Sequence, residues 1–381
     1  MINMNLHQAA SLIGGTLVGK AIQFIGISTD SRQDCKQKLF IALKGPHFNG
    51  EDHCQQALDN GAVAVLVSAA QDLQCPQIIC TNTLDGLTVL AKSWCKQCQV
   101  KVIAITGSNG KTTVKNMVQA IISVKHTCSA TEGNLNNEIG VPLTLCKIKN
   151  DDQYAIIEMG AAKLGDIKWL SSLLTIHSAA ITNVSAAHIG RFGNFANIIH
   201  EKGEIVANLA ENSHAILPID DKYYPEFQSR TAAKILSFGT RENADIRIEN
   251  ETDFNLNING ETITDIQLPV AGRHNQANAA CAAALAHSCS IEVDDIKLGL
   301  ENFTPAPGRL QNLGKINGNI IIDDSYNANP QSVKAAIDVL CQYPCPTTLV
   351  LADMAELGDE TNALHAQIGD YAKQHNISKL L

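Results

Sequence analysis

Residues 106–113 have the sequence TGSNGKTT, with the residue types and spacing of a phosphate-binding loop. Glycines let backbone N–H groups approach a phosphate, and a helix beginning at the lysine adds the positive end of its dipole. Lys111 would reach the β and γ oxygens of a nucleotide, and the Thr112 hydroxyl can bind Mg²⁺. The full eight-residue pattern has glycine where this chain has Ile105, so the loop is a shorter variant. The alternative interpretation is a glycine-rich turn before a helix.

The segments on either side of this loop favour the first interpretation. Residues 100–106 form an apolar, β-branched run typical of a buried strand, and the apolar residues after the loop keep helical spacing. These helical positions are Val114, Met117, Val118 and Ile121. The expected nucleotide contacts are therefore Gly107, Ser108, Asn109, Gly110, Lys111, Thr112 and Thr113.

Two further candidates follow apolar strands. Glu158 ends the next strand, where a carboxylate in a parallel sheet faces the same crevice as the loop and could hold a metal. His188 follows a third strand at 179–184 and is a borderline metal ligand. A solvated strand-end carboxylate and a structural histidine are the ordinary alternatives.

Lys202 interrupts a helical stripe that is otherwise apolar. The stripe consists of Phe195, Ile198, Ile199, Ile205, Val206 and Leu209. Spacing places the lysine on the inward face of this helix. The ordinary explanation is that its ammonium reaches water along the side-chain stem. A desolvated lysine instead has a lowered pKa, which makes the neutral amine available for chemistry or modification.

Two carboxamides share one face of an alanine-rich helix that starts near residue 274. Asn275 and Asn278 stand three positions apart, and an amide supplies the donor and the acceptor needed to contact a purine edge. Helix capping by Asn275 is an equally good local explanation.

Polar residues also follow the apolar segment at 319–322. Asn329 and Pro330 have the residue types that cap and start a helix, so they have a structural role. Asp323, Asp324 and Asn327 have no such role. Polar groups beyond the carboxyl end of a parallel strand are where α/β folds bind ligands, which makes these three candidates.

The 381 residues are enough for two or three domains. A small α/β unit is expected at 1–83, and a parallel sheet covered on both faces at 84–304, with a hairpin turn at Asn259-Gly260. A third α/β unit follows a proline-containing linker at 305–381. It stops where another strand begins, so we expect that domain to be incomplete.

Composition narrows the function classes. Hydrophobic residues make up 45% of the chain and charged ones 18%, which excludes a disordered protein. The net charge of -9 argues against general binding of nucleic acid or anionic membranes, so a small-molecule partner is expected. No secretion signal or membrane-spanning run is evident, which predicts a cytoplasmic protein whose 12 cysteines are reduced.

Taken together, the motifs resemble the ATP-dependent Mur ligases of peptidoglycan synthesis. The segments that carry the resemblance are TGSNGKTT at 106, GNLNNEIGVPLTL at 133, IIEMGA at 156, ITNVSAAHIGRFG at 181, KGEI at 202, GRHNQANA at 272, PGRL at 307 and DDSYNANP at 323. STDSR at 28, LFIALKG at 39 and LADMAELGDE at 351 are most similar to the branch that adds D-alanyl-D-alanine to UDP-N-acetylmuramoyl-tripeptide.

The resemblance implies an α/β protein of three domains: an N-terminal UDP-sugar-binding domain, a central P-loop sheet and a C-terminal Rossmann-like domain. It implies a monomer that uses ATP and two Mg²⁺ ions. The peptide carboxylate is phosphorylated to an acyl phosphate, which the amine of D-alanyl-D-alanine then displaces. This chemistry needs cations because a carboxylate and a triphosphate repel each other.

The resemblance also assigns roles to residues. Thr112 and Glu158 match the ligands of one Mg²⁺, and His188 matches a ligand of the second. Lys202 matches a lysine that is carbamylated by CO₂. The residues of this chain that match nucleotide contacts of the family are Lys111, Asn275, Asn278, Arg309 and Asp324. Those that match substrate contacts are Ser28, Asp30, Ser31, Arg32, Lys44, Asn49, Gly50, Asn134, Asn137 and Asn327.

Two features limit the resemblance. Asn49 and Glu51 stand where relatives often carry Asp and His, which affects the UDP-sugar site. The chain also ends at Leu381, so a nucleotide-binding remnant without turnover is one alternative. A diamino-acid-adding Mur ligase or a folylpolyglutamate-type ligase is another, although DDSYNANP argues against both.

Overall fold

The computed structural model describes residues 1–185, 189–250, 252–343, 346–355 and 357–381. Contacts divide the chain into two compact units. Unit 1 comprises residues 1–102, 127–157 and 172–175, and unit 2 comprises residues 103–126, 158–171 and 176–381. None of the described helices is both long and apolar enough to cross a bilayer, and no described cysteine is in a disulfide.

Unit 1 is built on a five-stranded sheet of order β2-β9-β8-β5-β4. Strands β4, β5, β8 and β9 pair in parallel and β2 is antiparallel to β9, as the α/β pattern predicts. Its strands are β1 (Asn3–Asn5), β2 (Thr16–Val18), β3 (Gln23–Ile25), β4 (Ile27–Ser28), β5 (Leu39–Ile41), β6 (Lys44–Gly45), β7 (Phe48–Asn49), β8 (Ala64–Val67), β9 (Gln77–Ile79) and β11 (Cys128–Ala130). Its helices are α1 (Leu6–Ile13), α2 (Cys54–Asp59), α3 (Thr83–Cys98) and α5 (Gly140–Lys147), with the 3-10 helix η1 (Gly50–His53).

The boundary between the units passes through β10 (Lys101–Thr106) and β12 (Tyr154–Glu158). In unit 2, strands β10 and β13 to β18 are neighbours in chain order, and those from β13 to β16 pair in parallel. These strands are β13 (Ile176–Ile181), β14 (His214–Pro218), β15 (Lys234–Gly239), β16 (Ile246–Asn250), β17 (Asn255–Ile258) and β18 (Glu261–Ile263). The turn between β17 and β18 is Asn259-Gly260, both with positive φ, which confirms the predicted hairpin.

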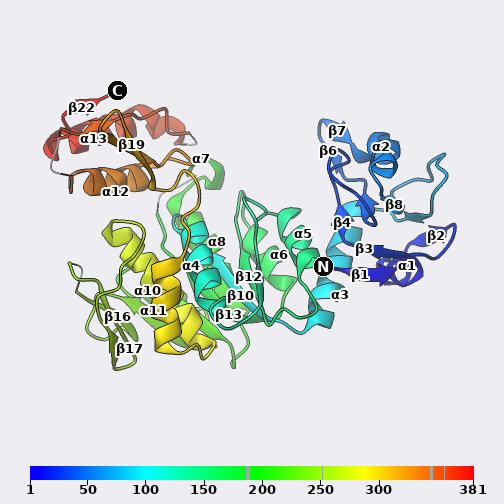
Figure 1. The fold of residues 1–381 in the computed structure, drawn as a ribbon, viewed down its shortest axis with the longest axis horizontal. Coiled ribbons are helices and arrows are strands. Elements are labelled where there is room, and N and C mark those ends of the chain that lie inside the picture. Colours follow the sequence, from blue (N-terminus) through cyan, green and yellow to red (C-terminus); the bar gives the residue numbers. More distant parts are fainter. Residues whose placement is uncertain (186–188, 251, 344–345, 356) are drawn as a thin grey trace. The chain divides into compact units, whose positions relative to one another are not determined.

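Helices cover this sheet as its apolar, β-branched strands require. Figure 1 shows α10 and α11 lying beside the strands of unit 2. The alanine-rich α10 packs closely on β13 to β16 and on α4, the helix that follows the phosphate loop. The helices are α4 (Lys111–Ile122), α6 (Asp166–Ser172), α7 (Ile189–Phe192), α8 (Phe195–Ala207), α9 (Tyr224–Ser229), α10 (Arg273–Ser288) and α11 (Val293–Asn302).

Close packing of α11 on α4 depends on Gly299. A Cβ added there would lie 2.3 Å from the Cα of Ile121, so a backbone would have to move. Gly299→Ala is therefore expected to destabilise the protein by about 1–3 kcal/mol. Gly369→Ala is the control, because the added methyl in that helix meets nothing within 4 Å. This variant should be neutral or stabilising by up to about 1 kcal/mol. Urea unfolding of both variants measures their free energies of unfolding. Equal changes in the two variants would contradict the prediction.

The last segment of unit 2 begins with strand β19 and continues from Asn319 as strand, helix, strand, helix and a final strand. Its elements are β19 (Gln311–Ile316), β20 (Asn319–Asp323), α12 (Pro330–Leu340), β21 (Thr348–Leu349), η2 (Gly358–Glu360), α13 (Thr361–Gln374) and β22 (Lys379–Leu380). Strands β21 and β22 pair in parallel. Val333 and Ile337 of α12 face a core that includes Met354 and Ile368. The expected linker at 305–308 has neither helix nor strand.

One expectation for this segment is wrong. The sequence predicts an apolar strand of a parallel sheet at residues 319–322, but β20 pairs antiparallel with β19 in a two-stranded hairpin. Ile320 and Ile321 are exposed at 44% and 36%. Asn317 and Gly318 between the strands both have positive φ, so an Asn-Gly turn closes the hairpin. The apolar run alone does not distinguish the two arrangements.

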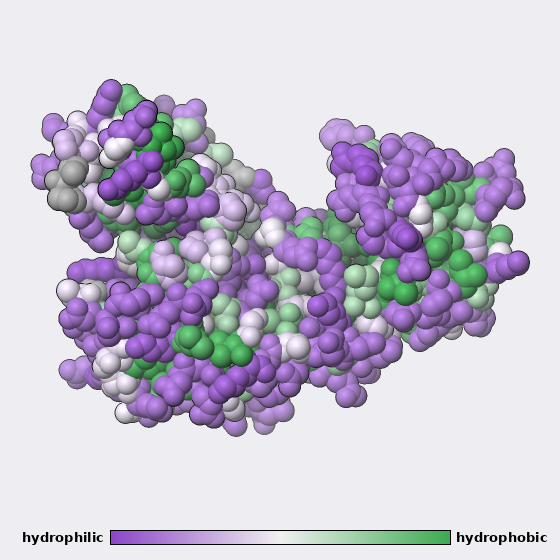
Figure 2. All heavy atoms as spheres, in the orientation of Figure 1, coloured by the Kyte–Doolittle hydropathy of each residue, from purple (hydrophilic) through white to green (hydrophobic). Residues whose placement is uncertain are grey.

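Hydrophilic residues cover most of the face shown in Figure 2, with smaller apolar areas between them. This distribution agrees with the negative net charge and with the absence of a spanning helix among the described residues.

Candidate active site

The phosphate loop is shaped by two glycines that no other residue could replace without movement. Gly107 has a φ of +152°, and a Cβ there would lie 1.9 Å from the Thr182 hydroxyl oxygen. Gly110 has a φ of +79° and caps α4, and its Cβ would lie 2.3 Å from Oδ1 of Asn278. The loop therefore packs directly against the end of β13 on one side and against α10 on the other.

Lys111 begins α4 and folds back into this loop. Its Nζ donates to the carbonyl oxygens of Gly107 at 2.8 Å and Ser108 at 3.2 Å. Burial lowers the pKa of Lys111, the charge of Glu158 opposes that shift, and Arg309 adds to it. A half-buried cation whose partners are two neutral carbonyl oxygens is suited to bind an anion in the loop.

Thr112 and Glu158 form a buried oxygen pair beside the lysine. The Thr112 hydroxyl donates to Oε2 of Glu158 at 2.9 Å and accepts from Nη2 of Arg309 at 3.2 Å. Glu158 is 2% exposed. A buried hydroxyl and carboxylate are hard oxygen donors of the kind that Mg²⁺ uses together with nucleotide phosphates.

The end of β13 holds the loop from the other side, a role that the sequence did not reveal. Thr182 donates its hydroxyl to the carbonyl of Asn109 at 2.6 Å, and Asn183 accepts from the Asn109 N–H at 3.1 Å. The Ser108 hydroxyl accepts from the N–H of Ser185 at 3.0 Å. The signal was the polar sequence TNVS directly after an apolar strand.

Lys202 lies on the inward face of α8, as its helical stripe predicted, although the helix ends before Leu209. The side chain is 5% exposed. Its pKa is lowered to about 7, mainly by burial and also by the nearby charge of Lys111, while Glu201 and Asp166 partly offset these effects. Lys202 thus shares one electrostatic environment with the phosphate loop.

The neighbouring Glu201 anchors α8 at this point. Its fully buried carboxylate accepts from the N–H groups of Gly165 and Ile167, both at 2.6 Å. These residues belong to the segment that follows Glu158, so α8 is fixed to the loop beyond β12. Leaving this carboxylate without its partners would be costly, which holds Lys202 in place.

The lowered pKa of Lys202 predicts a pH dependence of stability. Between pH 7 and 10.5 the unfolded lysine is protonated and the folded one is neutral, so unfolding takes up a proton and stability rises with pH. Below pH 7 both states are protonated and the desolvation cost is fully present. In CO₂-free buffer, wild type should gain up to about 1.4 kcal/mol per pH unit over Lys202→Met in this window. Denaturation at several pH values checks this, and parallel pH profiles would contradict it.

Asn275 and Asn278 are buried side by side near the start of α10. Gly272 is the N-cap, so the capping alternative for Asn275 is wrong. Asn275 donates instead to the Ala271 carbonyl at 2.7 Å and accepts from Asn278 at 3.2 Å. Next to them is a cavity of about 430 Å³ lined by Gly272, Arg273, His274, Ala335, Asp338 and Gln342. Burial lowers the pKa of His274 beside it.

Arg309 and Asp324 bring the last segment of the chain to the same loop. The Arg309 guanidinium lies 4.2 Å from the ring centre of Tyr326, and its buried Nε has no partner among the described residues. Asp324 accepts from the N–H of Leu310 at 3.0 Å. Burial raises the pKa of Asp324 to about 6 against the effects of that bond and of Arg309. Asn327 is exposed, and its Oδ1 accepts from the next backbone N–H.

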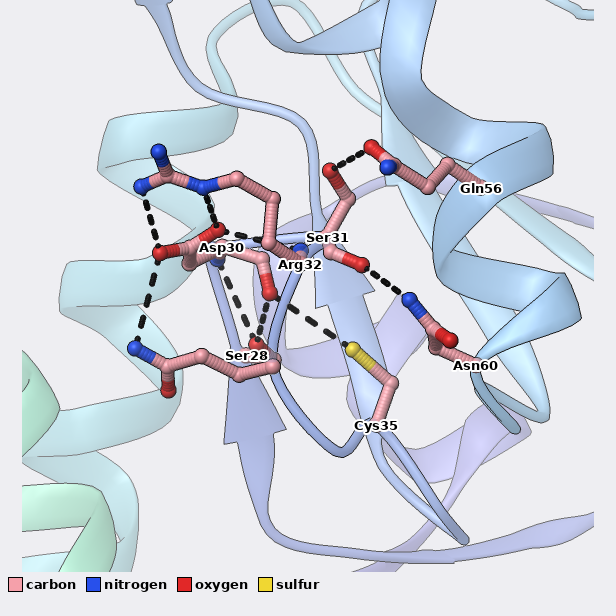
Figure 3. A network of polar contacts seen from close by, with 8 residues as sticks. Ser28, Asp30, Ser31, Arg32, Cys35, Gln56 and Asn60 are labelled. Atoms are coloured by element: carbon pink, nitrogen blue, oxygen red, sulfur yellow. Dashed lines mark hydrogen bonds and ion pairs between the residues drawn. The ribbon is translucent and has the colours of Figure 1, made fainter.

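The remaining candidates lie in unit 1. Figure 3 shows the loop after β4, where Arg32 donates two hydrogen bonds to Asp30, both at 2.8 Å, and lowers the pKa of that carboxyl to about 2. Ser28 donates to the Asp30 carbonyl at 3.0 Å, and Ser31 donates to Gln56 at 2.7 Å. The loop is therefore rigid, with the Arg32 guanidinium at its surface.

A second loop in unit 1 holds Lys44, Asn49 and Gly50. Lys44 is exposed, and Gly50 is buried so tightly that a Cβ would lie 2.6 Å from the Leu43 carbonyl. Asn49 accepts from the N–H of Glu51, whose carboxylate accepts in turn from Ser68 and Ala69. The departure from the family pattern at Glu51 thus has a structural use, bracing the turn after β8.

Asn134 and Asn137 complete the candidates in unit 1. Asn134 is exposed, and the side chain of Asn137 accepts from the N–H of Gly140 at 2.9 Å at the start of α5. His188 lies outside the described residues. Within unit 2, the structure therefore gathers Lys111, Thr112, Glu158, Lys202, Asn278 and Arg309 around one loop.

Three models of Mur ligase domains match this chain. Residues 22–126 match the model of the Mur ligase family catalytic domain, residues 105–286 that of the Mur ligase middle domain, and residues 308–381 that of the Mur ligase, glutamate ligase domain. The chain belongs to the Mur ligase family.

Particular members of the family are similar over the whole chain. UDP-N-acetylmuramoyl-tripeptide–D-alanyl-D-alanine ligase of Escherichia coli is 40% identical over 100% of this chain and 86% of its own length. The ligase of the same name from Haemophilus influenzae is 33% identical over 99% and 84%. A crystal structure of MurF from Acinetobacter baumannii superposes with a TM-score of 0.94 at 32% identity, covering 100% of this chain and 85% of that one.

A further match is MurF of Thermotoga maritima in complex with ADP, with a TM-score of 0.81 and 26% identity over 91% of this chain and 82% of that one. The α/β fold with its central sheet is therefore the fold of these enzymes.

Proposed function

We propose that this chain is an ATP-dependent, ADP-forming ligase that joins D-alanyl-D-alanine to UDP-N-acetylmuramoyl-tripeptide. The observation that carries the proposal is the phosphate loop itself, with a half-buried Lys111 beside the buried Thr112–Glu158 pair. The 40% identity to a ligase of that name supports the choice of substrates. The enzyme would act in the cytoplasm, where ATP is available, as a monomer in peptidoglycan precursor synthesis.

The domain roles follow the family. Residues 1–83 bind the UDP-sugar, residues 84–304 bind ATP, and residues 305–381 contact the nucleotide. The Ser28–Arg32 loop supports the first role because a rigid loop with an exposed guanidinium is suited to a diphosphate or a uracil edge. The other contacts proposed for the UDP-peptide and the incoming dipeptide are Lys44, Asn49, Gly50, Asn134, Asn137 and Asn327.

The chemistry proceeds in two displacements. A carboxylate oxygen of the tripeptide bonds to the γ phosphorus as the bond to ADP breaks. The amine of D-alanyl-D-alanine then bonds to the carbonyl carbon, loses a proton, and releases phosphate with that carboxylate oxygen. Lys111 and Arg309 neutralise negative charge as the two anions meet.

The residues present fit a magnesium ion. Thr112 and Glu158 would hold it with the nucleotide phosphates, and its charge would reduce the repulsion between substrates. A second Mg²⁺ is proposed at His188. For the nucleotide, Asn275, Asn278 and Asp324 are proposed contacts, and the cavity beside Gly272 and His274 has room for part of it.

Carbamylation of Lys202 is also part of the proposal. A pKa of about 7 leaves much of the amine neutral near neutral pH, and the neutral amine is the form that reacts with CO₂. The neutral amine nitrogen bonds to the carbon of CO₂ and loses one proton, which converts a neutral group near Lys111 into an anion. That anion can support a metal site, which an ammonium would repel.

Release of phosphate with substrates omitted in turn tests the function. Phosphate should appear only when ATP, UDP-N-acetylmuramoyl-tripeptide and D-alanyl-D-alanine are all present. Release with the shorter UDP-dipeptide and a diamino acid would assign the chain to the preceding ligase, and release with a folate and glutamate would assign it to the folylpolyglutamate type. ATP binding without release under all conditions would support the nucleotide-binding remnant.

A further inference from the structure

Asn109, at the tip of the phosphate loop, contacts the start of α12 through its side chain. Asn329 Nδ2 donates to Asn109 Oδ1 at 2.7 Å, and Asn109 Nδ2 donates to Gln331 Oε1 at 3.4 Å. The same Nδ2 donates to the Ser185 hydroxyl at 3.3 Å. Both ends of one amide in the loop are therefore occupied, and two of its three partners lie 220 and 222 residues away in sequence.

The capping role of Asn329 fixes which end of its amide faces the loop. Its Oδ1 accepts from the N–H groups of Gln331 at 3.1 Å and Ser332 at 3.0 Å, which makes it the N-cap of α12. Because the oxygen must face the helix, the Nδ2 group faces Asn109. Asn329 is 8% exposed, so water competes little for this hydrogen bond.

The backbone of Asn109 is held just as firmly by the sheet. Its N–H donates to Asn183, and its carbonyl accepts from the Thr182 hydroxyl and from Asn183 Nδ2 at 3.0 Å. The tip of the loop is thus fixed by β13 through the backbone and by α12 through the side chain. Any shift of α12 relative to β13 must break these bonds or move the loop.

We infer that the Asn109–Asn329 pair is a latch that couples docking of the C-terminal segment to the geometry of the phosphate loop, with Asn329 as a positioning residue. When the latch is formed, the backbone at the tip of the loop is already fixed in one arrangement before the nucleotide binds. When it is broken, nucleotide binding must also order the loop, which weakens affinity. The inference takes only nucleotide binding at this loop from the proposed function.

Asn329→Ser separates the latch from the cap. Serine caps helices about as well as asparagine but cannot reach Asn109, so Tm should stay close to that of wild type. The Kd for ADP, measured by calorimetry, should rise by roughly 3–10-fold, because this is the change in affinity that the loss of one hydrogen bond produces. Hydrogen exchange of residues 107–110 in the nucleotide-free protein should also become faster. Asn82→Ser, the same change at the N-cap of α3, should leave both readouts unchanged.

A double-mutant cycle with Asn109→Ala gives the decisive result. If the two side chains are coupled, Asn329→Ser should add little to the effect of Asn109→Ala on the Kd for ADP. Additive effects, or a Kd for Asn329→Ser equal to that of wild type, would overturn the latch. Should Asn329→Ser unfold, Gln331→Ala replaces it, with a smaller expected increase in Kd. Because these measurements need no turnover, coupling without ligation would leave the latch standing and refute the proposed function.

Discussion

Lys111→Ala is expected to abolish ligation, lowering kcat by about 10³-fold or more while the protein stays folded. In the proposed function Lys111 is the cation that contacts the γ phosphate, and a cation fixed in this position stabilises the charge of the transition state. Loss of its two bonds to loop carbonyls costs little, because alanine is a good residue at a helix start. Phosphate release and circular dichroism measure the two effects.

Lys163→Ala provides the matched control for this variant. Lys163 is an exposed lysine of unit 2, so its removal changes the net charge equally without touching the loop. Activity of Lys111→Ala within tenfold of this control would mean that the phosphates bind elsewhere.

Lys202→Ala is expected to lower kcat by about 10²–10³-fold and to leave ADP affinity nearly unchanged. In the proposed function the lost group is a carbamate anion, which would support the site without contacting the nucleotide. Small carboxylates such as acetate should restore part of the activity, because the shortened side chain leaves space for an anion at the same position. Wild-type enzyme depleted of CO₂ should regain activity when bicarbonate is added.

Two results would contradict this account of Lys202. Activity close to that of Lys168→Ala, which removes an exposed lysine of α6, would show that Lys202 has no catalytic role. The second result is a Lys202→Ala variant that stays inactive with acetate, together with a wild type whose activity does not respond to bicarbonate. It would show that Lys202 does not act as a carbamate.

The features of the site that depend on local sequence could be predicted. Strand, glycine loop and helix at 100–122 are specified by residues adjacent in the chain, and the inward position of Lys202 follows from helical spacing alone. Glu158 was expected at a strand end near the loop and lies there, bonded to Thr112.

Features that depend on long-range pairing could not be predicted. The contact of Asn329 with Asn109 spans 220 residues, so the sequence suggested only its capping role. The antiparallel pairing of β20 was missed because its apolar run fits either a parallel or an antiparallel strand, although Asn317-Gly318 was a local signal for the hairpin. Burial of Asn275 against Ala271 likewise follows from the packing of α10 rather than from its residue types.

Transfer of an isotope from peptide to phosphate tests the central claim most directly. UDP-N-acetylmuramoyl-tripeptide labelled with ¹⁸O in its terminal carboxylate is incubated with ATP, D-alanyl-D-alanine and the enzyme, and the released phosphate is analysed by mass spectrometry. One ¹⁸O atom per phosphate is expected, because the carboxylate oxygen bonds to the γ phosphorus before the amine displaces it. Release of unlabelled phosphate alongside the amide product would contradict activation of the carboxylate at the Lys111 loop.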